Sequence, residues 1–108
     1  MKRSNLNRPG PVSKKAPDPV RIEREEAWIG DAVLSLYARK YILSTTGSMD
    51  QPEFAAMTCN SFLRAFGPPT RVESRIGQVY EQQGLEAAFA LIEAEFLPLY
   101  LKQKRNRR

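Results

Sequence analysis

One long segment near the start of the chain, residues 19–43, most constrains what this sequence can fold into. Asp18 and Pro19 form a helix start, because Asp is a favoured N-cap and Pro is favoured at the first helical position. Apart from Gly30, where the helix either continues or breaks, no helix breaker occurs before the STTGS sequence that follows. From Ile29 onward the segment is apolar on most sides, which predicts a central, buried helix rather than a surface one.

Three further helices are expected, and no window alternates with the period of two that strands show. They run from beyond Asp50 to Gly67, from Thr70 to Gly84, and from Leu85 to about Leu101. Pro98 should kink or end the last of them, because proline cannot donate the backbone hydrogen bond that a helix interior needs. The sequence therefore predicts an all-α fold, a compact bundle of about four helices with its folded domain at residues 18–101.

Both ends of the chain are basic, whereas the body between them is acidic. Residues 1–17 are rich in Pro, Gly, Ser and Asn without periodicity, which predicts a disordered basic arm. Residues 102–108 form a basic tail with five positive charges and no negative one, and residues 19–101 carry seven basic and eleven acidic side chains, a net charge of −4. Such tails favour a polyanion, RNA or DNA, through phosphate contacts. The alternative is that they serve solubility or a loose attraction to any anionic surface.

The composition removes several kinds of chemistry. The chain has no histidine and a single cysteine, Cys59, which excludes His-based catalysis, an internal disulfide and a cysteine metal cluster. Any reaction falls to carboxylates or to a hard metal ion bound by oxygen. One cysteine, no secretory signal and no apolar run approaching the roughly 20 residues of a membrane span lead us to expect a cytoplasmic protein. The small core and the apolar first helix predict a homodimer that shares this surface.

Asp31 lies inside the otherwise apolar run of residues 28–37. An ionised carboxylate is costly to bury unless it is paired, hydrogen-bonded or bound to a cation. One interpretation is that Gly30 and Asp31 start a helix, with Asp31 as its N-cap. The other is that Asp31 lies mid-helix, because helix-compatible sequence extends back to Pro19. There it either faces a solvent groove or binds something.

Glu73 is the second acid whose context distinguishes it. Thr70 stands three positions before it, and Thr-x-x-Glu has the form of a capping box, in which the two residues bond to each other's backbone N–H. In that case the Glu73 oxygens are occupied by a structural role. The open alternative is that Glu73 turns toward Asp31. The remaining acids are spaced as solvated helix faces are, and no phosphate loop or zinc spacing is present.

Two stretches of the sequence are similar to the motifs of one family. EEAWIGDAVLSLYARKYIL resembles the signature helix of the ribonuclease III domain, approximately E-x-L-G-D-A-V-L-x-L. RVESRIGQVYEQQGLEAAFALI resembles that domain's second motif, approximately D-x-x-E-A-L-I-G-A-I-Y-x-D-x-G. The resemblance covers residues 25–43 and 70–92. It is closest to Mini-ribonuclease III, the short form without a double-stranded-RNA-binding domain, which also reads A-Y-I-G-D-A and has a Thr three positions before its second-motif Glu.

The resemblance implies a mechanism and a partner. Asp31 and Glu73 would coordinate Mg²⁺ and carry the catalysis, whereas the family's other two acidic positions are Ala27 and Thr70 here. The family is a homodimer that cuts double-stranded RNA, and Trp28 would lie near the dimer contact. The Mini branch implies an endoribonuclease that matures ribosomal RNA precursor. The basic tail could supply the phosphate contacts, through the side chains of Lys102, Lys104, Arg105, Arg107 and Arg108.

One departure from the family leaves alternatives open. The segment joining the two motifs is shorter by about two helices, and in the family these helices shape the catalytic valley. The chain is then either a reduced enzyme or a catalytically inactive RNA-binding protein that keeps the fold and joins a ribonucleoprotein. A third reading is a small helical dimer whose tails bind a protein or an anionic surface. Glu26 and Glu53 are candidates for a further metal ligand, although nothing in the spacing requires one.

Overall fold

Helix α1 (Pro19–Thr46) is one unbroken helix of 28 residues in the computed structural model, which describes residues 18–107. The Asp18 side chain accepts a hydrogen bond from the Val20 N–H at 3.0 Å, as an N-cap does. Gly47 ends the helix in the left-handed conformation, with φ of 83°. The helix passes through Gly30 without a break. The predicted disordered arm, residues 1–17, lies outside the described residues.

The single helix expected from beyond Asp50 to Gly67 is instead two short ones. Helix α2 (Gln51–Thr58) starts at an Asp50 cap, whose side chain accepts from the Glu53 N–H at 3.0 Å, and helix α3 (Asn60–Leu63) follows it. Between them Cys59 is extended, with ψ of 157°. The Thr58 hydroxyl donates to the Phe54 carbonyl at 2.9 Å, a local bond that bends or weakens helices.

The second half of the chain is helical almost throughout. Helix α4 (Pro69–Gln83) ends at Gly84, which has φ of 98°, and α5 (Leu85–Leu91) begins directly after it. A π-helical turn, η2 (Ile92–Phe96), joins α5 to α6 (Leu97–Asn106). Pro98 therefore does not end the helix, because the π turn before it accommodates the missing N–H. The helix also continues past Leu101, so residues 102–106 of the basic tail are helical.

These segments confirm the predicted all-α fold. The consecutive α5, η2 and α6 follow one another without a break, and α2 and α3 occupy the region of one expected helix, so the bundle has about four members. Residues 18–107 contain no strand. None of the described helices is both long enough and apolar enough to cross a membrane.

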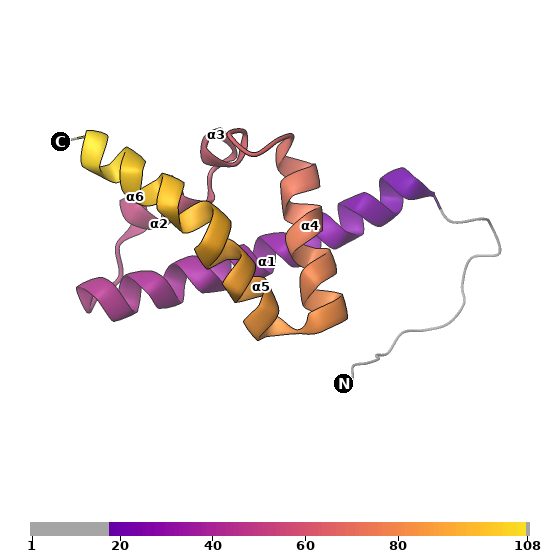
Figure 1. Cartoon of the computed structure of the whole chain (residues 1–108), viewed down its shortest axis with the longest axis horizontal. Coiled ribbons are helices and arrows are strands. Elements are labelled where there is room, and N and C mark those ends of the chain that lie inside the picture. Colours follow the sequence, from indigo (N-terminus) through magenta and orange to yellow (C-terminus); the bar gives the residue numbers. More distant parts are fainter. Residues whose placement is uncertain (1–17, 108) are drawn as a thin grey trace.

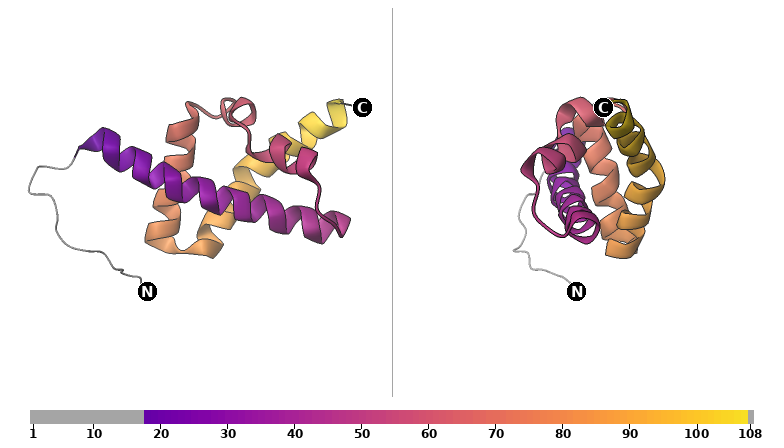
Figure 2. Two further views of the ribbon diagram at one scale, coloured as in Figure 1. Left: turned by 180° about the vertical axis from the view of Figure 1, so that it is seen from behind. Right: turned by 90° about the vertical axis from the view of Figure 1, so that its left-hand side faces the viewer.

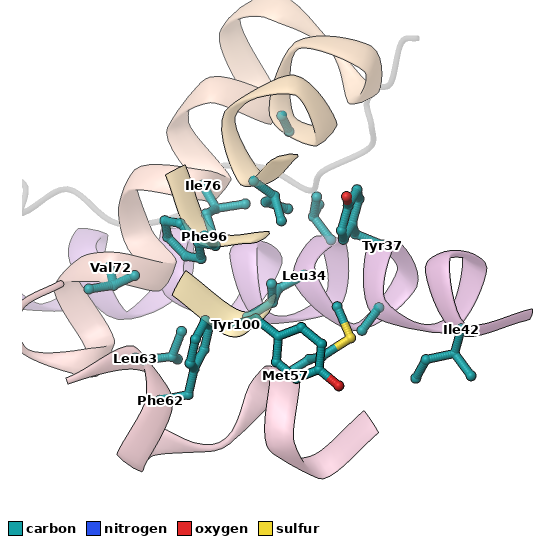
Figure 3. Packing of buried hydrophobic residues seen from close by; sticks show 14 residues of the cluster. Leu34, Tyr37, Ile42, Met57, Phe62, Leu63, Val72, Ile76, Phe96 and Tyr100 are labelled. Carbon is teal, nitrogen blue, oxygen red and sulfur yellow. The ribbon is translucent and has the colours of Figure 1, made fainter. Parts of the chain in front are cut away.

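Helix α1 forms one side of the molecule, and the second half of the chain covers it from the other. Figure 1 shows α4 crossing α1 near its middle, and the two views of Figure 2 place α4, α5 and α6 on the same side of α1. The core lies between these layers (Figure 3), and its least exposed large side chains are Leu34, Leu63, Ile76, Ile92, Phe96 and Tyr100. The rings of Phe66 and Phe96 stack at 4.4 Å between centroids, which holds the turn after α3 against η2.

Candidate functional site

The crossing of α1 and α4 is built on two glycines. A Cβ added to Gly30 would overlap the Glu73 carbonyl, and one added to Gly77 would overlap the Glu26 carbonyl. No larger residue fits at either position without moving a backbone, because the overlaps are with main-chain atoms. The two helices therefore touch backbone to backbone, and the side chains next to the crossing come close together.

Asp31 and Glu73 face each other at this crossing. Asp31 is exposed in the middle of α1, which excludes the N-cap interpretation, and Glu73 is partly buried in the first turns of α4. Burial, the charge of Asp31 and a side-chain hydrogen bond to Asp31 raise the pKa of Glu73 from its ordinary 4.5 to about 7. Two carboxyl groups can share a hydrogen bond only when one holds a proton. The pair is therefore a site of concentrated negative charge that favours either a proton or a cation.

The capping box between Thr70 and Glu73 does not form. The N-cap of α4 is Pro68, Pro69 is the first helical residue, and no side chain bonds to the cap. Two prolines in succession start the helix before Thr70, because proline is suited to the first helical position. Thr70 then lies within the first turn, and the Glu73 side chain is free to turn toward Asp31.

An open hollow of about 320 Å³ lies over the carboxylate pair. Its lining comes from one stretch of α1 and the first turns of α4: Arg24, Ala27, Trp28, Asp31, Thr70 and Glu73. Ala27 and Thr70 stand where the motifs that the sequence resembles have their other two acidic residues. Their short side chains leave the space over Asp31 and Glu73 open. Because the hollow is open to solvent, water and a polar ligand can reach the two carboxyl groups.

Neither Glu26 nor Glu53 adds a third carboxylate to this hollow. Glu26 accepts hydrogen bonds from the Ser74 hydroxyl and the Gln78 amide, both at 2.9 Å, and so its carboxylate links α1 to α4. Glu53 pairs with Lys104 at 2.8 Å, between α2 and α6. Within residues 18–107 no group of three or more His, Cys, Asp or Glu side chains could together hold a metal ion.

Two carboxylates nevertheless suit Mg²⁺. This ion dehydrates reluctantly and is commonly held by one or two protein carboxylates together with several waters and substrate phosphates. The Asp31–Glu73 pair supplies that donor set, and the open hollow has the space for the waters. Burial and, after it, the charge of Asp31 raise the pKa of Glu73, and a divalent cation between the two carboxyl groups would favour the ionised form.

The predicted RNA-binding side chains lie at the end of α6. Lys102, Arg105 and Arg107 are exposed there, and Arg108 lies outside the described residues. Lys104 differs from its neighbours, because its ammonium group pairs with Glu53, whose side chain is 14% exposed. In Figure 1 this end of α6 lies near α2, away from the α1–α4 crossing. The basic helix end and the carboxylate pair are thus separate features.

Trp28 on α1 is 76% exposed. Leu36 and Leu43 are also exposed and lie on the same helix face by the 3.6-residue period. We call Trp28, Leu36 and Leu43 the apolar stripe. An exposed tryptophan with two leucines in line is typical of a surface that contacts another macromolecule.

Sequence reasoning missed one member of the hollow, Arg24. It lies seven residues before Asp31, which is two helical turns and therefore the same side of α1. The signal was present in this spacing, but Arg24 stands among several charged residues that resemble a solvated helix face.

The fold and the site together define an all-α domain with a carboxylate pair held at a backbone contact between two helices. Comparisons with protein-family models, with curated proteins and with solved structures returned no match. The relationship to ribonuclease III accordingly stays a prediction that depends on the two sequence motifs.

Proposed function

We propose that this protein is a Mg²⁺-dependent endoribonuclease of the Mini-ribonuclease III type that cuts double-stranded RNA, with ribosomal RNA precursor in the cytoplasm as its substrate. The observation that carries the proposal is the approach of Asp31 to Glu73 beneath an open hollow. These residues are far apart in the sequence and belong to the two motifs that resemble the family. A fold that served only structure would have no need to bring two carboxylates together, since their repulsion is unfavourable.

Four side chains of the hollow have a role in the chemistry of this proposal. Asp31 and the ionised form of Glu73 hold the metal, while Ala27 and Thr70 keep the approach to it open. When Mg²⁺ is bound there, it supplies a Lewis acid for the phosphate, a bound water of lowered pKa, and charge to offset the leaving oxygen. No histidine is needed for this chemistry, which agrees with a sequence that has none.

A homodimer is part of the proposal, and the apolar stripe supports it. Trp28 lines the hollow and also belongs to the stripe, so a contact made by α1 would lie beside the carboxylate pair. Two copies related by a twofold axis would each present one site to the same duplex, one for each strand.

Recognition of RNA is proposed to use backbone and shape, because the deep, narrow major groove of duplex RNA prevents side chains from reading the bases. Residues 19–101 have a net charge of −4, so phosphate contacts must come from local clusters of cations. The exposed side chains of Lys102, Arg105 and Arg107 form one such cluster.

The test is cleavage of a short RNA duplex with Mg²⁺ by the wild type, Asp31→Asn and Glu73→Gln, with Glu81→Gln as an exposed control on α4. We expect the wild type and the control to cut, and the two site variants to lose activity by at least about 100-fold, in line with the several kcal/mol that metal catalysis supplies. A wild type that cuts nothing, or site variants that cut as well as the wild type, would reject the enzyme.

A second candidate function is an inactive RNA-binding protein that keeps the fold within a ribonucleoprotein. It is favoured by the separation of the basic end of α6 from the carboxylate pair, because RNA could bind there without the site. This candidate predicts salt-sensitive RNA binding that survives both Asp31→Asn and Glu73→Gln and does not require Mg²⁺.

A further inference from the structure

Of the side chains within residues 18–107 that line the hollow over Asp31 and Glu73, Arg24 alone is basic. It projects from α1 two turns before Asp31, on the same side of the helix. Since α1 is unbroken from Pro19 to Thr46, one rigid helix fixes the position of Arg24 relative to Asp31.

Arg24 has no carboxylate partner among the described residues. Ion pairs within residues 18–107 engage four other cations, as follows: Arg21 with Glu25, Arg71 with Glu23, Arg75 with Glu95, and Lys104 with Glu53. No side-chain hydrogen bond in the described part of the chain includes Arg24 either. Its exposed guanidinium group therefore keeps its donors for a ligand, although three glutamates lie within two residues of it in the sequence.

The charges of the hollow indicate what that ligand is. Two carboxylates and one divalent cation sum to zero, so a phosphodiester that enters carries an uncompensated negative charge. A second negative charge develops on the phosphoryl oxygens as the nucleophile attacks. A site with only two acids and one metal ion thus lacks one positive charge, and Arg24 is placed to supply it. The guanidinium group suits this task, because its planar donors match two phosphate oxygens at once.

We infer that Arg24 binds the non-bridging oxygens of the RNA phosphate that sits over the Asp31–Glu73 pair. This inference rests on the proposed function and assigns that site a substrate-binding residue. Arg24 is a ligand of the phosphate and not of the metal.

A structural role for Arg24 makes the opposite prediction for the metal. If the guanidinium served to hold the two carboxylates in position, its removal would weaken Mg²⁺ and RNA together. If it binds phosphate, its removal takes a positive charge away from the metal site, so Mg²⁺ binds as tightly as before or more tightly while RNA binds less tightly.

The experiment compares the wild type with Arg24→Gln, Arg24→Lys and a matched control, Arg21→Gln, which is one turn away on α1 and pairs with Glu25. Two quantities are measured: the affinity for a short RNA duplex with Ca²⁺ in place of Mg²⁺, and the rise in melting temperature caused by Mg²⁺ alone. Cleavage of the same duplex by the wild type in Mg²⁺ is recorded in parallel.

We expect Arg24→Gln to weaken RNA binding by about tenfold, as the loss of a charge-assisted hydrogen bond does, and Arg24→Lys to weaken it less. Arg21→Gln should stay within about twofold of the wild type, and the Mg²⁺-induced rise should persist in every variant.

Three results would overturn the inference. Equal RNA affinity of Arg24→Gln and Arg21→Gln, with a wild type that still cuts, rejects the role of Arg24 alone and leaves the nuclease proposal intact. Loss of the Mg²⁺-induced rise in Arg24→Gln assigns the residue to the structure of the site. A wild type that neither binds nor cuts the duplex rejects the inference together with the proposed function.

Discussion

Gly30 on α1 lies directly against the backbone carbonyl of Glu73 on α4, and the side chain of that same Glu73 faces Asp31. One contact therefore sets both the distance between the two helices and the distance between the two carboxylates. A glycine at position 30 is required by close approach and not by an unusual backbone conformation, since it lies within the regular helix α1.

Replacing Gly30 by alanine should destabilise the fold. Alanine favours a helix by about 1 kcal/mol over glycine, but its Cβ would force α1 and α4 apart, at a cost of about 1–3 kcal/mol or more. We expect Gly30→Ala to lower the free energy of unfolding in urea, and Lys40→Ala, an exposed change on the same helix, to stay within about 0.5 kcal/mol of the wild type. A Gly30→Ala protein as stable as the wild type would show that the backbones do not touch.

The stability of the metal-free protein should fall as the pH rises from about 4.5 to about 7. Glu73 binds its proton more tightly in the folded chain, where its pKa is about 7, than in the unfolded chain, where the ordinary value of 4.5 applies. The folded state therefore binds more protons than the unfolded state in this interval. The loss of stability caused by ionising Glu73 is complete above pH 7. Glu73→Gln removes this cost of ionisation and should raise the free energy of unfolding at pH 8 by about 1 kcal/mol, after allowance for the partial exposure of the Glu73 side chain.

The measurement is thermal or urea unfolding of the wild type and Glu73→Gln at pH 4.5 and pH 8, without divalent cations. The two proteins should be nearly equal at the lower pH, and Glu81→Gln should show no such pH dependence. A Glu73→Gln protein that is less stable than the wild type at pH 8 would contradict the carboxylate pair.

Trp28 should be the main determinant of self-association. A tryptophan that is 76% exposed in the monomer and buried in a dimer acts as a hot spot, commonly worth at least about 2 kcal/mol. Trp28→Ser should raise the dimer dissociation constant by about 30-fold or more in sedimentation experiments. Tyr80→Ser, which alters another exposed aromatic residue on α4, serves as the control. A wild type that is monomeric at high concentration would remove the dimer from the proposal.

Lys104 and Lys102 should behave differently, although they stand two residues apart in the basic tail. Lys104 is bonded to Glu53 at 2.8 Å. Burial by itself would raise the pKa of Glu53, but the bond from Lys104 and the charges of Lys104 and Arg107 outweigh it and lower that pKa. Lys104→Ala should therefore cost about 0.5–1 kcal/mol of stability, whereas Lys102→Ala should cost almost none. For RNA the order reverses, and Lys102→Ala should cause the larger loss of affinity. Equal effects of the two changes on both properties would argue against a structural role for Lys104.

Much of the fold follows from local signals in the sequence. Asp18 and Pro19 start α1 where the sequence predicts, and Gly84 ends α4 where expected, because caps depend on neighbouring residues alone. The interruption at Cys59 is not predictable in the same way, since the apolar spacing of residues 55–66 continues through it. The extension of α6 beyond Leu101 is stabilised by Lys104 and its distant partner Glu53, which no local pattern reveals.

The site shows the same division between local and distant information. Asp31 and Glu73 are recognisable as unusual from the sequence, but Thr70 and Glu73 also fit a capping box, and only the preceding prolines and the position of α1 decide between the two. Gly30 likewise permits a helix break or a close helix contact, and the partner helix determines which occurs. Arg24 acquires a distinct environment only when α4 brings Glu73 to the same hollow.

Crystals grown with Mn²⁺, whose anomalous scattering locates the metal, test whether Asp31 and Glu73 share one divalent cation. We expect one peak in the hollow, bonded to a carboxylate oxygen of Asp31 and to one of Glu73 at about 2.0–2.2 Å, with the other positions filled by water. The same experiment on Asp31→Asn should show no peak. A wild-type structure at pH 8 in which the two side chains remain bonded to each other, with no metal between them, would contradict the claim.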